Sequence, residues 1–188
     1  HMGYSIAWIL VRGKTKEDVL AQLSLADTGE PDEANESPVS GAALPDGSYL
    51  LFFNDMAHAA TQAPNMARLS DGCEALGCQV EENVMASAAF LYKDGVKAWD
   101  VVHLAEQGLY HLAVDGAPPV LLETIHTEMK ASQDEDGGED AEVDWLFEVP
   151  LMLATALSGY RHDEAALLSG DTLVFTELVP ASPGGRTH

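Results

Sequence analysis

Apolar residues fall into short blocks along the chain, and most of these blocks have the length and composition of buried β-strands. The first block, residues 4–12, is rich in β-branched and aromatic residues and is followed by Gly13. Similar blocks recur between segments rich in Gly, Pro, Asn and Asp. The expected strands cover residues 4–12, 48–53, 80–92, 96–104, 109–114 and 171–180.

Helical spacing of apolar residues predicts the remaining elements. Val19, Leu20 and Leu23 share one face of a helix that Thr15 caps. A second helix is expected from 65 to 76. The longest apolar block of the chain is residues 143–163. In the second half of the chain, helices are expected at 120–130 and 150–158, with a further turn or two of helix at 162–168. Pro150 suits the first turn of the helix at 150–158, and Gly159 suits its end.

Residues 80–114 carry the clearest pattern in the sequence. Asp94-Gly95 favours a type I′ hairpin turn, a second turn is expected at 106–108, and Pro118-Pro119 prevents further extension. These features predict a three-stranded antiparallel meander. The full order of elements, β-α-β-α-β-β-β-α-α-β, predicts an α+β fold with a mixed or largely antiparallel sheet and helices packed on it.

Two polar stretches interrupt the apolar blocks, at residues 27–47 and 133–142. Both are rich in acidic residues and lack apolar periodicity, so we expect acidic loops, the first of them mobile. We expect residues 3–180 to form a single domain, as their length allows. Residues 181–188 are expected to be a flexible tail.

The charge balance limits the kinds of partner. Nine Lys and Arg stand against 31 Asp and Glu, which gives a net charge of −22 and a pI near 4.3. Such a surface repels nucleic acid and anionic membranes and attracts basic proteins. The simpler alternative is that the acidity only confers solubility or reflects a salt-rich source. No apolar run reaches the length of a transmembrane helix, so a membrane location is not expected.

Neither the cysteines nor the acidic stretch predicts a metal or cofactor site. Cys73 and Cys78 do not form a disulfide framework, and together with the lack of a visible signal peptide they favour a cytoplasmic protein. Their spacing lacks the second ligand pair of a zinc site. When Gly137 is aligned with the glycine of a calcium-binding EF-hand loop, Val143 falls where the final carboxylate ligand is required.

Histidines provide the only candidate catalytic groups. In Arg161-His162-Asp163, the carboxylate beside the imidazole is typical of a general base, and the guanidinium of an anion site. Adjacent residues on a helix do not face each other, however, so these residues also suit the end of a helix. His103 and His111 are expected opposite Tyr110 and Val102 on neighbouring strands, with their rings on opposite faces.

The favoured function is that of a non-catalytic acidic binding protein. Its most concrete form is a bacterial immunity or antitoxin protein that neutralises a basic toxin, such as a nuclease; an inhibitor that mimics DNA fits the same features. The alternatives are a hydrolase-like enzyme that uses His162 or His111 with nearby carboxylates, and a regulatory or scaffold subunit. No P-loop, G-x-S-x-G, G-x-G-x-x-G or H-E-x-x-H motif occurs. The expected partner-binding residues are Asp134, Glu135, Asp136, Glu139, Asp140 and Glu142.

Overall fold

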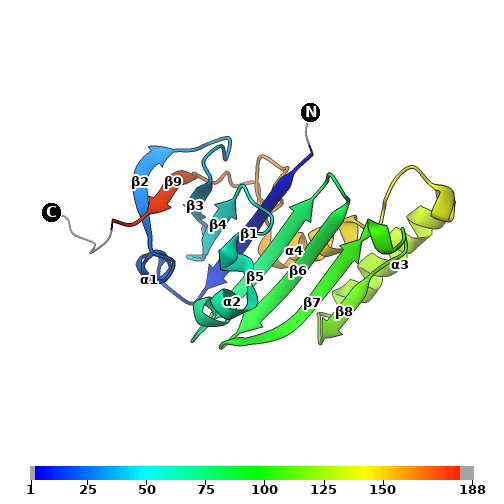
Figure 1. Ribbon diagram of the computed structural model, residues 1–188, viewed down its shortest axis with the longest axis horizontal. Helices are drawn as coiled ribbons and strands as arrows, with labels where there is room; N and C mark the ends of the chain where they lie inside the picture. The colour runs from blue at the N-terminus through cyan, green and yellow to red at the C-terminus, as the bar shows by residue number, and fades with distance from the viewer. Residues whose placement is uncertain (1–2, 183–188) are drawn as a thin grey trace.

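A nine-stranded antiparallel sheet forms the centre of the molecule (Figure 1). The computed structural model describes residues 3–182. The strands follow the order β2-β9-β3-β4-β1-β5-β6-β7-β8. Their bounds are β1 (Ser5–Arg12), β2 (Leu25–Pro31), β3 (Val39–Ala43), β4 (Tyr49–Phe53), β5 (Glu74–Glu81), β6 (Ala86–Lys93), β7 (Val96–Leu104), β8 (Ala113–Gly116) and β9 (Thr176–Pro180).

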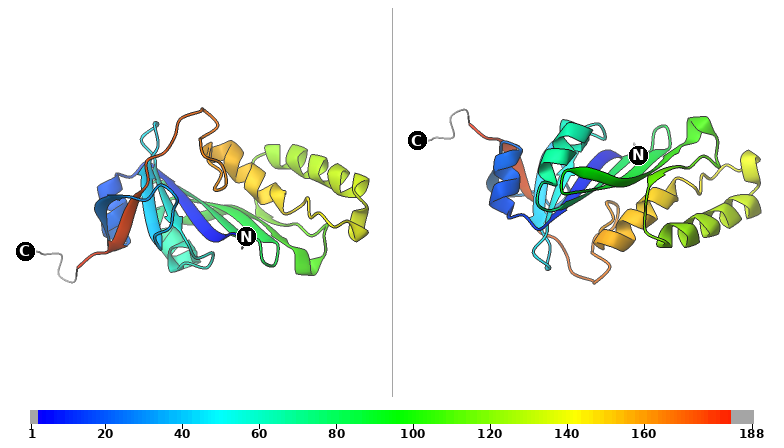
Figure 2. Two further views of the ribbon diagram at one scale, coloured as in Figure 1. Left: turned by 90° about the horizontal axis from the view of Figure 1, so that it is seen from above. Right: turned by 90° about the horizontal axis from the view of Figure 1, so that it is seen from below.

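Helices pack on both faces of this sheet (Figure 2), which confirms the predicted α+β fold. One face carries α1 and α2, and the other carries α3 and α4. The α-helices of the described residues are α1 (Lys16–Gln22), α2 (Ala63–Leu69), α3 (Leu121–Glu135) and α4 (Glu148–Ser158). Three short 3₁₀ turns are η1 (Ala59–Thr61), η2 (Ala105–Gln107) and η3 (Gly138–Asp140).

Strand β1 separates two apolar cores. Trp8 and Leu10, each 1% exposed, belong to the core beneath α3 and α4. Ile9 and Val11, both 0% exposed, belong to the core beneath α1 and α2. A strand that is covered on both faces needs apolar residues at consecutive positions, which explains why this block lacks polar alternation.

The predicted meander exists, with strand bounds that differ from those expected. Asp94 and Gly95 have φ values of 49° and 83°, as the expected hairpin turn requires. Residues 82–85 form a turn, however, so the strand predicted at 80–92 begins only at Ala86. The strand predicted at 109–114 is instead β8, which starts at Ala113.

The helix predicted at residues 65–76 is wrong in its second half. Helix α2 ends at Leu69, and β5 begins at Glu74 and pairs with β1. Gly77, which directly follows the predicted helix, lies near the centre of β5. A Cβ atom there would lie 2.2 Å from Cε2 of Phe90, so only glycine lets this ring pack against the strand.

The acidic stretch at 27–47, which we predicted to be a loop, contains two strands. Its start belongs to β2, which pairs with β9, and β3 lies between β9 and β4. Backbone hydrogen bonds to distant strands hold these residues in place, so the backbone of β2 is ordered although Thr28 and Glu30 remain exposed.

The last third of the described chain also departs from expectation. Helix α3 extends to Glu135, so the loop predicted at 133–142 begins inside a helix and then contains η3. Gly159 ends α4 in the left-handed conformation, as predicted. Turns and bends replace the helix expected at 162–168, and the strand expected at 171–180 is confined to β9. Most of the tail predicted at 181–188 lies outside the described residues.

Candidate partner-binding surface and its support

The predicted partner-binding residues form an exposed surface at one end of the molecule. We call Asp134, Glu135, Asp136, Glu139, Asp140 and Glu142 the acidic ridge. It follows the last turn of α3, the 3₁₀ turn η3 and the segment after it, and all six side chains are exposed. No Lys or Arg occurs between Lys130 and Arg161, and no ion pair among the described residues involves a carboxylate of the ridge.

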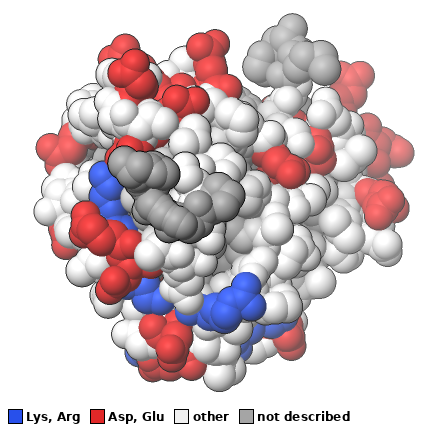
Figure 3. Space-filling view, turned by 60° about the vertical axis from the view of Figure 1, so that its left-hand side comes forward, with Lys and Arg blue, Asp and Glu red and all other residues white. Residues whose placement is uncertain are grey.

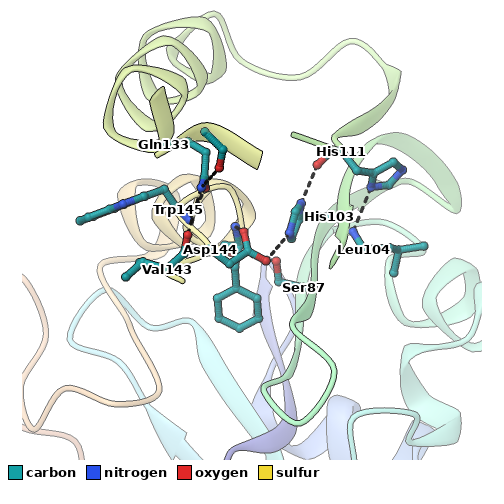
Figure 4. Close-up of polar contacts among 10 residues, drawn as sticks. Ser87, His103, Leu104, His111, Gln133, Val143, Asp144 and Trp145 are labelled. Carbon is teal, nitrogen blue, oxygen red and sulfur yellow. Dashed lines mark hydrogen bonds and ion pairs between the residues drawn. The ribbon is translucent and has the colours of Figure 1, made fainter. Parts of the chain in front are cut away.

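A single buried side chain, Gln133, fixes the shape of the ridge (Figure 4). Its side chain is 0% exposed. Its Nε2 donates hydrogen bonds of 3.0 Å to the carbonyl oxygens of Gly138 and Val143, and its Oε1 accepts one of 2.9 Å from the backbone N–H of Trp145. These bonds join both ends of the segment that carries the ridge, so the ridge is an ordered structure and not an open loop.

Two of the ridge carboxylates also hold aromatic side chains. Asp134 accepts a hydrogen bond from the hydroxyl of Tyr110, and this bond raises the pKa of Tyr110 to about 12. Asp136 accepts one of 3.1 Å from the indole Nε1 of Trp145. The other four carboxylates of the ridge accept no hydrogen bond from the described residues and remain free for a partner.

Beneath the ridge, a buried histidine and a carboxylate attach this segment to the sheet (Figure 4). Nε2 of His103 lies 2.7 Å from Oδ2 of Asp144; His103 is 0% and Asp144 9% exposed. Nδ1 of His103 lies 2.5 Å from the carbonyl oxygen of His111, and a carbonyl only accepts, so Nδ1 carries a hydrogen. The contact at Nε2 therefore requires a second hydrogen, shared between the imidazole and the carboxylate.

Further hydrogen bonds make this attachment a network. Oδ1 of Asp144 accepts a bond of 3.2 Å from the backbone N–H of Phe147, whose carbonyl oxygen accepts one of 2.8 Å from the Ser87 hydroxyl of β6. Both ring nitrogens of His103 are engaged and the side chain has no access to solvent. We therefore assign His103 and Asp144 to support of the ridge and not to chemistry.

The predicted pairing of His103 and His111 is wrong. In the structure Val102 pairs with Ala113, and His111 lies in the turn that precedes β8. The ring centroids of the two histidines are 6.1 Å apart, so the rings lie close together and do not point to opposite faces of the sheet. Nδ1 of His111 accepts a hydrogen bond of 2.9 Å from the backbone N–H of Leu104, so this ring also has a structural contact.

Arg161, His162 and Asp163 lie together after α4 but are not arranged for general-base catalysis. Arg161 contacts Glu148 at 2.8 Å and Asp163 at 2.7 Å. Partial burial alone would lower the pKa of Arg161, but the two carboxylates outweigh it and raise this pKa. Asp163 therefore pairs with the guanidinium and not with the imidazole of His162.

His162 is mostly buried, and both of its ring nitrogens lack a hydrogen-bond partner among the described residues. Its ring packs edge-on against Tyr4, with centroids 4.6 Å apart, and burial lowers its pKa. The side chain borders a hollow of about 330 Å³ that Tyr160 and Phe175 also line. An imidazole in this setting is mainly neutral and packs as an aromatic ring.

Several basic residues, among them Lys16 of α1 and Arg68 of α2, lie toward the other end of the sheet. Figure 3 shows this end, where Lys and Arg lie among acidic side chains. Lys16 contacts Asp27 at 2.7 Å, and Arg12 contacts Asp46 at 3.6 Å. Acidic residues there form ion pairs, whereas no ion pair among the described residues involves a ridge carboxylate.

Searches with protein-family models, curated proteins and solved structures find no match to this chain. Among the described residues, no group of three or more His, Cys, Asp or Glu side chains is placed to hold a metal ion. No helix of this part of the chain has the length and apolar character needed to cross a membrane.

The sequence predicted an exposed acidic segment at these six residues, which the structure shows, but it did not reveal the groups that support the segment. Leu122, Ile125 and Met129 mark the inward stripe of α3, and Gln133 is the next position on that stripe. The sequence signal that could have identified Gln133 is therefore a polar residue in line with the apolar stripe of a helix. The contact between His103 and Asp144 joins residues 41 positions apart and has no such signal.

Proposed function

We propose that the protein is a non-catalytic binding protein whose acidic ridge docks on a basic protein. Within this class, the favoured role is that of a bacterial immunity or antitoxin protein that neutralises a basic toxin, such as a nuclease, by direct binding. This role would place it in the cytoplasm, where the sequence leads us to expect it. A net charge of −22 supports a cationic partner and disfavours nucleic acid.

The observation that carries this proposal is the combination of free carboxylates with a fixed backbone. Glu135, Glu139, Asp140 and Glu142 have no hydrogen-bond donor among the described residues, and Gln133 holds the segment that presents them. A surface that is already ordered loses little conformational entropy when it binds. Exposed charges of one sign also accelerate association with an oppositely charged partner.

The histidines give less support to catalysis. His103 is enclosed, His111 accepts a backbone hydrogen bond, and His162 does not pair with its neighbouring carboxylate. A general base needs an accessible nitrogen and a geometry that orients it. Binding through the ridge requires neither.

A growth-protection assay tests the proposed function. The chain is co-expressed in a bacterial host with the basic protein encoded by the adjacent gene, and survival is measured. The ridge variant carries Glu135→Gln, Glu139→Gln, Asp140→Asn and Glu142→Gln. The control variant carries Glu17→Gln, Glu30→Gln, Glu33→Gln and Glu36→Gln, which removes the same charge from exposed positions in the chain's N-terminal part.

We expect the unaltered chain and the control variant to protect growth and the ridge variant to lose protection. The purified ridge variant should associate with the same partner about tenfold more slowly at low ionic strength, and the difference should shrink in high salt. Absence of protection by the unaltered chain would contradict the toxin-neutralising role. Equal loss in both variants would contradict the assignment of binding to the ridge.

A further inference from the structure

A groove lies beside the acidic ridge, between α3, α4 and the turn that joins β5 to β6. Its volume is about 710 Å³. Met85, Met129 and Met152 line it together with Trp145 and Phe147. Gly3 also borders it, and the three methionines pack against the core beneath α3 and α4.

The lining of this groove is apolar and incompletely covered. Its three methionines are half of the six in the chain, and each is only partly buried. Val143, which also lines the groove, is 47% exposed. Flexible thioether side chains adapt to differently shaped apolar groups, and an uncovered apolar surface of this kind commonly marks an interaction site.

The rim of the groove is acidic. Glu82, Glu142 and Glu148 border it, and none of the described residues that line it is Lys or Arg. Glu148 already pairs with Arg161. Among the described residues, the Glu82 carboxylate accepts one hydrogen bond, of 3.1 Å from the backbone N–H of Tyr4, so Glu82 and Glu142 can each contact a cationic group.

Trp145 joins the groove to the ridge. Its backbone N–H is held by Gln133, and its indole Nε1 donates to Asp136 of the ridge. Its side chain also lines the groove, and Glu142 belongs to both surfaces. The ridge and the groove are therefore adjacent parts of one ordered segment, so a single partner segment can contact both.

We propose that this groove receives an apolar anchor side chain from the basic partner, with Lys or Arg beside the anchor facing Glu82, Glu142 and the ridge. The occupant is thus a segment of a cationic protein that carries Leu, Met or Phe between basic residues. This inference rests on the proposed function, because the same partner would contact the ridge. Apolar anchors in pockets commonly supply most of the affinity of an interface, while charges at its rim set the association rate.

Two short peptide probes test the groove. One contains Lys and Leu in an amphipathic pattern, and the other has Ser in place of every Leu at the same charge. Trp8 and Trp99 are 1% and 2% exposed, so Trp145 is the partly exposed member of the three tryptophans. The emission wavelength of Trp145 and its quenching by acrylamide therefore report whether the groove is filled.

We expect the affinity of the Lys–Leu peptide to be at least about tenfold higher than that of the Lys–Ser peptide, because the Lys–Leu peptide buries apolar side chains. It should also shift tryptophan emission to shorter wavelength and reduce quenching. Val143→Ser with Met129→Gln should remove this preference. Val120→Ser, at the other end of α3 and 80% exposed, is the matched control and should keep it. Circular dichroism checks folding, and Val143→Ser alone replaces the double variant if that variant is unfolded.

The outcomes separate the groove from the ridge. If both peptides bind equally and the ridge variant weakens both, the groove proposal fails while ridge binding stands. If the ridge variant binds both peptides as tightly as the unaltered chain, and the groove variant loses the Lys–Leu preference, the groove proposal stands while the assignment to the ridge fails. An emission shift that depends on protein concentration without peptide would assign the groove to a second copy of this chain and overturn the proposal.

Discussion

The two acidic segments, residues 27–36 and the acidic ridge, lie at opposite ends of the sheet and use their carboxylates differently (Figure 1). In the first, Asp27 pairs with Lys16, and the buried Asp32 accepts backbone hydrogen bonds from Glu36 at 2.8 Å and Ser37 at 3.1 Å. In the ridge, the neutral Gln133 holds the backbone and most of the carboxylates are left free.

The difference shows that a high density of acidic residues does not by itself define a binding surface. At residues 27–36, negative charge is part of the local structure, because Asp27 and Asp32 stabilise the backbone and neighbouring side chains. At the ridge, an uncharged amide performs that role, so the carboxylates can be changed without removing the support. Substitutions of Asp27 or Asp32 should therefore mainly lower stability. Substitutions of the free ridge carboxylates should mainly weaken binding.

The largest effect is expected at the attachment of the ridge to the sheet. Asp144→Ala should lower the free energy of unfolding by about 3–5 kcal/mol, because it leaves His103 buried without its carboxylate partner. Urea denaturation measures the change. Asp140→Ala, which changes an exposed carboxylate of the ridge, should stay within about 0.5 kcal/mol of the unaltered protein. Similar stabilities of the two variants would show that the buried pair does not support the ridge.

The next largest effect is expected at Gln133. Gln133→Ala removes the partners of three backbone groups, and we expect a loss of roughly 2–4 kcal/mol, since water can reach part of the opened segment. Gln133→Glu should be at least as damaging despite its similar shape, because an oxygen would face the carbonyls of Gly138 and Val143. Trp145 should become more accessible to acrylamide in both variants. Unchanged quenching would contradict the role of Gln133.

A smaller loss is expected at the corresponding position of the first segment. Asp32→Ala removes two hydrogen bonds to backbone N–H groups, and we expect it to cost about 1–3 kcal/mol. The quenching of Trp145 should not change, because the ridge has its own support. A change in the acrylamide quenching of Trp145 without a loss of stability would contradict the conclusion that Asp32 and Gln133 support separate ends of the molecule.

The smallest effect is expected at Lys16 and depends on pH. Burial alone would raise the pKa of Asp27, but hydrogen bonds from Lys16, the backbone of Gly29 and Thr176 hold it below its ordinary value of 3.8. A carboxyl whose pKa is lowered by folding stabilises the native state above that value, and the stabilisation is lost as pH falls through the folded-state pKa.

Lys16→Met should therefore lower stability at neutral pH by about 0.5–1 kcal/mol and reduce the further loss on acidification to about pH 2. Denaturation curves recorded at both pH values measure the difference. Lys130→Met is the control, because Lys130 forms no ion pair among the described residues. An equal pH dependence in the two variants would contradict the contribution of Lys16.

The sequence was informative where structure depends on local pattern. The run of apolar residues in β1, the turn at Asp94-Gly95 and the glycine that ends α4 each follow from chemistry within a few residues. The six ridge carboxylates were also located correctly on an exposed surface. These features need no knowledge of distant parts of the chain.

The failures arose where distant segments determine the structure. Met66, Leu69 and Leu76 have helical spacing, but pairing with β1 and β6 makes the chain extended from Glu74 onward. Strand β2 has little apolar alternation, and its order comes from pairing with β9 some 150 residues later in the chain. The support of the ridge by His103 likewise depends on a contact across the fold.

The position of β9 constrains the order in which the sheet can assemble during synthesis. Strand β2 pairs with β9 alone, and β9 also covers the edge of β3. A nascent chain that has not yet produced Thr176–Pro180 must therefore hold β2 without a strand partner, although β1, β4 and β5 can already pair. One end of the sheet can thus form early, while the other waits for a strand that leaves the ribosome late.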